Sequence, residues 1–117
     1  MNISIIGSGY VGLVSGTCFA ETGNYVTCVD IDKNKVESLS NGEITIFEPG
    51  LEKIFLKNVK EKRLSFTSNL EKGINKAQII FLALPTPPGK DGHADLRYIL
   101  GVADQLGNLI KDYKIII

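Results

Sequence analysis

Residues 2–12, NISIIGSGYVG, decide the fold of this chain, because they join an apolar, β-rich run to a glycine turn and the start of a helix. Gly7 permits the tight turn out of the strand, Gly9 lets the backbone approach a bound group closely, and Gly12 lets the helix pack on the sheet. The helix that begins at about Tyr10 directs its unpaired N–H groups and positive dipole end at the turn. The pattern predicts a binding site for the pyrophosphate of a dinucleotide, and an ordinary structural turn is the alternative.

An acidic residue follows at the distance that a dinucleotide site requires. Asp30 lies eighteen positions after Gly12, where a second predicted strand, residues 25–29, ends. A carboxylate there accepts hydrogen bonds from ribose hydroxyls and repels a 2′-phosphate, so the expected cofactor is NAD rather than NADP. Asp32 is the competing acid. Its expected role is the N-cap of the next helix, because caps favour short acidic side chains, but the two roles would be exchanged if the strand ended later.

Composition excludes several classes of protein. The length of 117 residues suits one domain, and 13 basic and 13 acidic residues leave no net charge. No basic face for nucleic acid or for an anionic membrane is indicated. No apolar stretch is long enough to span a bilayer, and no basic segment precedes the first apolar run, so the cytoplasm is the expected location.

Two cysteines and one histidine offer little for thiol or metal chemistry. Cys18 and Cys28 lack CxxC and zinc-ligand spacing, and both are expected to be small core residues. His93 lies in a glycine-rich loop, where we expect a solvent-facing side chain, with a general acid–base role as the alternative. Neither a metal site nor a catalytic residue is predicted in this chain.

Strand and helix patterns alternate along the chain. Strands are expected at residues 2–7, 25–29, 64–67, 78–84 and from 114, and helices at 10–22, 33–40, 51–62, in short form at 69–76, and after Asp95. Right-handed crossovers then leave one architecture, an α/β, doubly wound, Rossmann-like parallel sheet with strand order 3-2-1-4-5, truncated after the fifth strand. A ligand is expected across the carboxyl ends of strands one and four.

A rigid loop is expected at residues 85–92, PTPPGKDG, because prolines and glycines interrupt any periodicity. The loop leaves the carboxyl end of the fourth strand, so Thr86 is expected to face the glycine turn and reach the cofactor, with a plain turn role as the alternative. Lys35 lies on the first turn of the second helix. Its spacing fits either a contact with the adenosine ribose beside Asp30 or a solvated lysine.

The last helix is expected to be capped by Asp95. Its expected inward residues are Leu96, Ile99, Leu100, Ala103, Leu106 and Ile110. The strand that follows contains the run 115–117, III, which leaves an apolar edge on the sheet. Because exposed apolar edges promote association, the isolated chain is expected to self-associate or to be marginally stable.

Five motifs, in order along the whole chain, resemble the signatures of the nucleotide-sugar 6-dehydrogenases. They are residues 7–13, 29–32 with Lys35, 47–51, 85–87 and 92–96. The resemblance implies cofactor contacts at Val11, Asp30, Lys35 and Thr86, in addition to the glycine turn and Tyr10. No role for Glu48 follows beyond electrostatics at a helix start.

The family's activity implies what this chain does. Its members oxidise the C6 alcohol of a nucleotide sugar to a carboxylate with two NAD, and the resemblance favours UDP-glucose, with UDP-N-acetylmannosamine and GDP-mannose as alternatives. The family's catalytic residues are expected beyond Ile117, and neither Cys18 nor Cys28 matches the motif of its nucleophile. Residues 1–117 are therefore expected to be an NAD-binding domain, itself incomplete and inactive alone, without the central helical and substrate domains of a homodimeric enzyme. Another NAD-dependent oxidoreductase and a non-catalytic nucleotide-binding module remain the alternatives.

Overall fold

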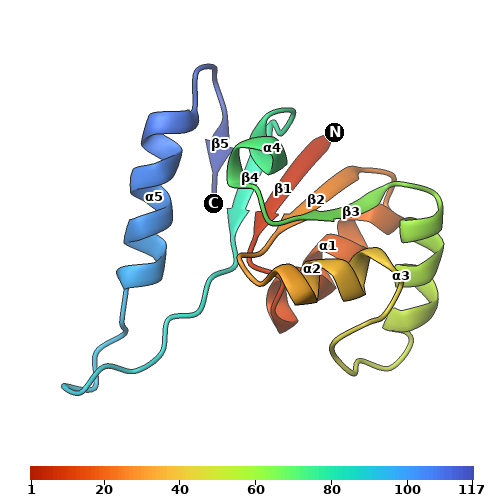
Figure 1. The fold of residues 1–117 in the computed structure, drawn as a ribbon, viewed down its shortest axis with the longest axis horizontal. Coiled ribbons are helices and arrows are strands. Elements are labelled where there is room, and N and C mark those ends of the chain that lie inside the picture. The colour runs from red at the N-terminus through yellow and green to blue at the C-terminus, as the bar shows by residue number, and fades with distance from the viewer.

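Five parallel strands form one sheet in a computed structural model that describes residues 1–117 (Figure 1). The strands are β1 (Asn2–Ile6), β2 (Tyr25–Val29), β3 (Leu64–Thr67), β4 (Ile79–Leu82) and β5 (Ile115–Ile116). Their order is β3-β2-β1-β4-β5, and every neighbouring pair is parallel. The predicted doubly wound sheet is therefore confirmed.

Helices cover both faces of the sheet. They are α1 (Tyr10–Glu21), α2 (Lys33–Ser40), α3 (Leu51–Lys60), α4 (Leu70–Ile74) and α5 (Arg97–Leu109). One apolar core joins α1, α2 and α3 to the first face and contains Ile3, Ile5, Leu13, Ala20, Val26, Cys28, Leu39, Phe55 and Leu64. A smaller core joins α4 and α5 to the second face and contains Ile6, Val29, Ile74, Ala77, Ile80 and Leu106. No helix is both long and apolar enough to cross a membrane.

Gly16 lets α1 pack closely on the sheet. A Cβ atom there would lie 2.9 Å from Sγ of Cys28 and 3.3 Å from Cδ1 of Ile5. This packing was expected at Gly12, and Gly16 is a second position on α1 that requires it. Cys28 is buried as expected, whereas Cys18 is exposed, so its expected core position is wrong.

Helix α5 departs most from expectation. It begins at Arg97, and Asp95 does not cap it: the Asp95 carboxylate accepts hydrogen bonds from the backbone N–H and guanidinium of Arg97 instead. Of the six residues expected to face inward, Leu106 alone is fully buried, and Leu96, Leu100 and Ala103 are exposed. The physical reason is the long loop after β4, which carries the start of α5 away from the sheet (Figure 1).

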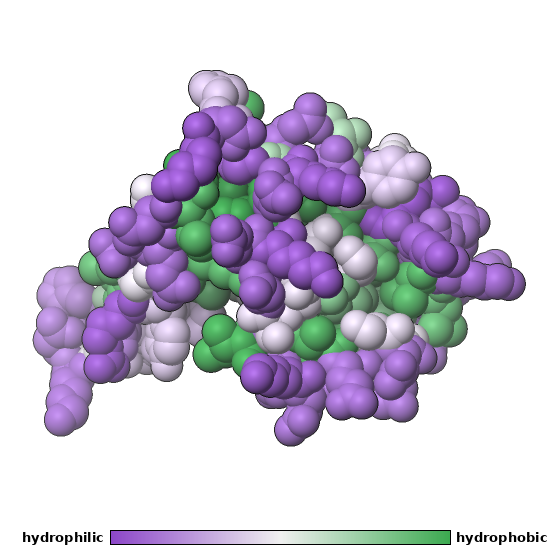
Figure 2. All heavy atoms as spheres, turned by 45° about the horizontal axis from the view of Figure 1, so that its top comes forward, coloured by the Kyte–Doolittle hydropathy of each residue, from purple (hydrophilic) through white to green (hydrophobic).

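Smaller differences concern the ends of elements. Helix α3 ends at Lys60 instead of residue 62, because Lys62 has a left-handed φ of 58°. Its N-cap is Gly50, with a φ of 81°. The surface is mostly polar, with apolar residues visible between charged ones on the face that Figure 2 shows.

Candidate functional site

The glycine turn lies where the carboxyl ends of β1 and β4 meet. Gly7 has a φ of 103°, and a Cβ atom there would lie 2.3 Å from the carbonyl oxygen of Ala83. Its N–H donates to the carbonyl of Val29 at 2.7 Å. Only glycine tolerates both the positive φ and this close backbone approach. The turn is thus held between the ends of three strands, at the position that the topology predicts for a ligand.

The N-terminus of α1 opens to the surface beside this turn. Gly9 is the N-cap, and no atom lies within 4 Å of the position of a Cβ atom there. The N–H groups of residues 9–12 make no hydrogen bond within the chain, and the first helical bond runs from Leu13 N–H to the Gly9 carbonyl at 2.9 Å. Tyr10 and Val11 are 53% and 67% exposed. Free donors at the positive end of a helix dipole fit a phosphate group.

Gly12 lets the first turn of α1 pack closely on the residues that directly follow β1 and β4, as expected. A Cβ atom on Gly12 would lie 1.9 Å from the carbonyl oxygen of Gly7 and 3.3 Å from Cβ of Ala83. The first turn of α1 therefore rests directly on the glycine turn. Any side chain at this position would displace the N–H groups of the helix from the strand ends.

Asp30 lies directly after β2 and binds both the glycine turn and α2. Its Oδ2 accepts hydrogen bonds from the Ser8 hydroxyl at 2.6 Å, from the Ser8 N–H at 3.0 Å and from Nζ of Lys35 at 3.2 Å. Its Oδ1 accepts one bond, from the Asp32 N–H at 3.0 Å. One carboxylate oxygen is thus saturated, and the other retains acceptor capacity for a ligand hydroxyl.

The environment of Asp30 keeps it ionised. Burial raises its pKa, but hydrogen bonds from the Ser8 hydroxyl, from the N–H groups of Asp32 and Ser8 and from the Lys35 ammonium outweigh burial, so the net pKa is lowered. Its side chain is 12% exposed. A fixed negative charge at this position disfavours a second anion, such as a 2′-phosphate.

The competing acid has the structural role that sequence analysis expected. Asp32 is the N-cap of α2, and its Oδ1 accepts from the N–H groups of Asn34 and Lys35 at 3.0 and 3.1 Å. The cap also fixes the first turn of α2, which carries the Lys35 side chain toward Asp30.

Thr86 does not contact the group formed by Ser8, Asp30 and Lys35. The residue that abuts Gly7 is Ala83, whereas Thr86 is exposed and makes no hydrogen bond within the chain. The loop beyond it is closed by a bond from Gly89 N–H to the His93 carbonyl at 2.7 Å, and the His93 side chain is 86% exposed. Contact between Thr86 and a cofactor stays a prediction.

Two contacts at the site were missed by sequence analysis. One is the pair of bonds from Ser8 to Asp30, since Ser8 occupies a variable position of the glycine pattern and no periodicity marks it. The other joins the hydroxyl of Tyr10 to the carboxylate of Glu48, which precedes α3. That hydrogen bond raises the pKa of Tyr10 and ties the segment before α3 to the first residue of α1.

Thiol and metal chemistry find no support at the site. Burial, followed by the nearby charge of Asp30, raises the pKa of the Cys28 thiol to about 12. A thiol with this pKa is protonated at neutral pH and is a poor nucleophile. No cluster of three or more histidine, cysteine or acidic side chains could hold a metal ion.

Comparisons with known proteins agree with this geometry. Residues 1–117 match the NAD binding domain of the UDP-glucose/GDP-mannose dehydrogenase family. The chain is 50% identical over 115 residues to UDP-glucose 6-dehydrogenase TuaD of Bacillus subtilis, covering 98% of this chain and 25% of that protein. It is 46% identical over 117 residues to a UDP-glucose 6-dehydrogenase of Pseudomonas aeruginosa, covering 100% of this chain and 26% of that protein.

A solved structure of a related dehydrogenase contains the same fold. A ternary complex of GDP-mannose dehydrogenase from Pseudomonas aeruginosa superposes with a TM-score of 0.91 at 36% identity, over 96% of this chain and 26% of that one. The chain therefore spans about a quarter of the length of the relatives that it matches.

Proposed function

This chain belongs to the UDP-glucose/GDP-mannose dehydrogenase family as an NAD-binding domain, and we propose that it holds the NAD of an enzyme that oxidises UDP-glucose to UDP-glucuronate. The observation that carries the proposal is the free N-terminus of α1 beside the ionised carboxylate of Asp30. The names of the relatives at 50% and 46% identity favour UDP-glucose over GDP-mannose, the substrate named for a structure at 36% identity.

We assign one part of the cofactor to each group of residues. The N–H groups of residues 9–12, which include Tyr10 and Val11, bind the diphosphate, and Gly7 and Gly12 keep that helix end close to the strands. Asp30 Oδ1 accepts from a hydroxyl of the adenosine ribose, and Lys35 supports it from α2. Thr86 lies on the loop that follows β4 and serves the nicotinamide side. The bound NAD supplies the hydride acceptor.

We propose that the catalytic groups and the sugar site belong to other parts of the enzyme. No cysteine of this chain suits the nucleophile, since Cys28 is buried with a raised pKa and Cys18 does not match the motif of the family's nucleophile. By resemblance to the family, the proposal also includes a homodimeric enzyme in the cytoplasm.

The domain itself is proposed to extend beyond these five strands. Leu96 and Leu100 on α5 are 48% and 62% exposed, and residues 115–117 on the edge strand are 44–61% exposed. Apolar surface of this kind is normally covered, so the chain alone is expected to self-associate. A dispersed monomer in size-exclusion chromatography, with a sharp thermal transition, would contradict this expectation.

Calorimetric titration of the chain with NAD, NADP and UDP-glucose, each alone, tests the proposed function. We expect NAD to bind, NADP to bind more weakly and UDP-glucose to bind little or not at all. Failure of NAD to bind would overturn the proposal. Equal affinities for NAD and NADP would remove the assigned role of Asp30, and tight binding of UDP-glucose would place the sugar site within this chain.

A further inference from the structure

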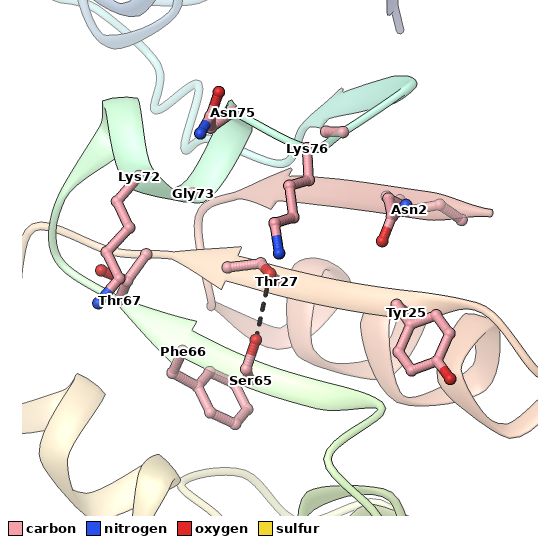
Figure 3. Close-up of a pocket in the computed structure, with 12 residues that line it drawn as sticks. Asn2, Tyr25, Thr27, Ser65, Phe66, Thr67, Lys72, Gly73, Asn75 and Lys76 are labelled. Atoms are coloured by element: carbon pink, nitrogen blue, oxygen red, sulfur yellow. Dashed lines mark hydrogen bonds between the residues drawn. The ribbon is translucent and has the colours of Figure 1, made fainter.

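A hollow lies on the face of the sheet that carries α4, away from the glycine turn (Figure 3). Its volume is about 380 Å³, which falls within the range of small-molecule sites. Strands β1, β2 and β3 form its floor, and α4 with the residues after it forms its roof. The residues assigned to NAD at the carboxyl ends of the strands do not line it.

The floor of this hollow carries hydroxyl groups where a doubly wound sheet is usually apolar. Thr27 and Ser65 line the hollow, and strand register aligns Thr27 with Ser65 on β3 and with Ser4 on β1, although Ser4 itself is not a lining residue. Oγ1 of Thr27 and Oγ of Ser65 are 3.1 Å apart. The hydroxyl of Ser4 is fully buried and has no hydrogen-bond partner.

The roof of the hollow supplies positive charge. Lys72 and Lys76 line it, neither lysine forms an ion pair, and no carboxylate is among its twelve lining residues. This is a local imbalance, because acidic and basic residues are equal in number over the chain. In Figure 3 the Lys76 side chain extends across the hollow toward Thr27, and the Lys72 amine lies beside Thr67. A concave surface lined by ammonium groups concentrates their electric field and therefore attracts anions.

Helix α4, which carries Lys72 and is followed two residues later by Lys76, is held firmly against the sheet. Asn69 caps α4, its Oδ1 accepting from the Lys72 N–H at 2.8 Å. Gly73 is buried, and a Cβ atom there would lie 2.2 Å from Cγ2 of Val29 and 3.2 Å from Cγ2 of Thr67. Glycine at this position therefore brings the backbone of α4 close to β2 and β3, which fixes the position of Lys72 and of the turn that contains Lys76.

We propose that this hollow binds the phosphate group of a small molecule, at a site separate from that of NAD. The ammonium groups of Lys72 and Lys76 neutralise the charge of the phosphate, and the hydroxyls of Thr27 and Ser65 donate further hydrogen bonds to its oxygens. Tyr25, which is 59% exposed, borders the hollow and offers an aromatic face to a sugar or base attached to the phosphate. The ligand class is a phosphate monoester, with free inorganic phosphate sharing the same chemistry.

Amide NMR of the ¹⁵N-labelled chain tests this proposal. Inorganic phosphate and UMP are titrated separately, at constant ionic strength and with NAD present. We expect saturable shifts at the amides of Thr27, Ser65, Thr67 and Gly73. Tighter binding of UMP than of phosphate would identify a phosphate monoester as the ligand, and equal binding would identify phosphate alone. Shifts that do not saturate, or that are confined to residues 8–12, would overturn the proposal.

Two double variants that remove the same charge distinguish phosphate binding in the hollow from nonspecific attraction by surface lysines. The variant Lys72→Ala/Lys76→Ala removes both ammonium groups, and Lys33→Ala/Lys53→Ala removes two exposed lysines that form no ion pair on α2 and α3. We expect the first pair to weaken phosphate binding about ten-fold or more and the second to leave it unchanged. Equal affinities in the two double variants would overturn the proposal. All four lysines are exposed, and the amide spectra themselves report whether each variant is folded.

Discussion

The hydroxyl of Ser8 donates to Oδ2 of Asp30 at 2.6 Å, and the N–H of the same serine donates to the same oxygen at 3.0 Å. The two residues are 22 positions apart in the chain and follow the ends of two neighbouring strands, β1 and β2. Ser8 is 1% exposed, so these bonds are largely shielded from water. The pair couples the glycine turn to the acid that we propose binds the ribose, and it leaves Oδ1 as the oxygen with free acceptor capacity.

Removal of the Ser8 hydroxyl should weaken NAD binding. Ser8→Ala deletes the shorter of the two bonds and loosens the Asp30 side chain, at a cost of about 1 kcal/mol, or roughly five-fold in affinity. Calorimetry with NAD measures the effect. Ser68→Ala, at an exposed serine without a side-chain hydrogen bond, is the control and should bind NAD normally. Normal binding by Ser8→Ala as well would show that Asp30 does not need this support.

The two acids after β2 should respond differently to substitution. Asp30→Ala should reduce NAD affinity by roughly 1.5–3 kcal/mol and narrow the preference for NAD over NADP, because a charged acceptor is lost. Asp32→Ala removes a helix cap and should lower the free energy of unfolding by about 0.5–2 kcal/mol while preserving the cofactor preference. Titration with both cofactors and urea unfolding distinguish the two effects. An altered preference in the Asp32 variant would reverse the assignment.

Stability should fall in acid, partly through Asp30. Its pKa in the folded chain is lowered below the ordinary 3.8, so its carboxylate stabilises the fold above that value, and this contribution is lost as the pH falls through the lowered pKa. Urea unfolding of the chain and of Asp30→Asn at pH 7 and about pH 3 measures it. Glu21 and Asp95, whose pKa values are also lowered, remain in both proteins, so the difference isolates Asp30. An equal loss in both proteins would exclude this contribution.

Three glycines in helices should tolerate alanine in a definite order. Gly12→Ala should destabilise most, because its Cβ would meet the backbone carbonyl of Gly7, and Gly16→Ala should cost roughly 1–3 kcal/mol through overpacking against Cys28. Gly101 on α5 has no atom within 4 Å of a Cβ position, and Gly101→Ala should stabilise by about 0.5–1 kcal/mol. Thermal and urea unfolding rank the three. A neutral Gly12 variant would mean that the glycine turn can move.

The contact between Tyr10 and Glu48 should be visible in the titration of the phenol. Its hydrogen bond to the Glu48 carboxylate, followed by burial and by the glutamate charge, raises the pKa of Tyr10. Glu48→Gln removes the charged acceptor and should lower that pKa toward its ordinary value, as followed by NMR of the tyrosine ring. The other three tyrosines of the chain are internal controls. An unchanged Tyr10 titration would show that the contact does not persist in solution.

Much of the fold could be predicted because it depends on neighbours in the chain. The tight turn at Gly7, the cap at Asp32 and the left-handed end of α2 at Gly42 each follow from the backbone preference of one residue in its local context. The alternation of apolar strands with amphipathic helices, together with right-handed crossovers, was sufficient for the sheet order. The pyrophosphate site at the start of α1 and the position of Asp30 could be predicted for the same reason, since strand ends in such a sheet meet at one edge.

The strand order, the glycine turn and the acid beside it could all be read from the sequence, because backbone sterics and hydrophobic periodicity act over a few residues. The meetings of distant groups depend on the packing of whole elements: Ser8 with Asp30, Tyr10 with Glu48, and the lysines of α4 and of the turn after it with the hydroxyls of β2 and β3. The tertiary structure also holds the apolar start of α5 away from the sheet. Contacts of this kind depend on how whole elements pack, and no local propensity encodes them.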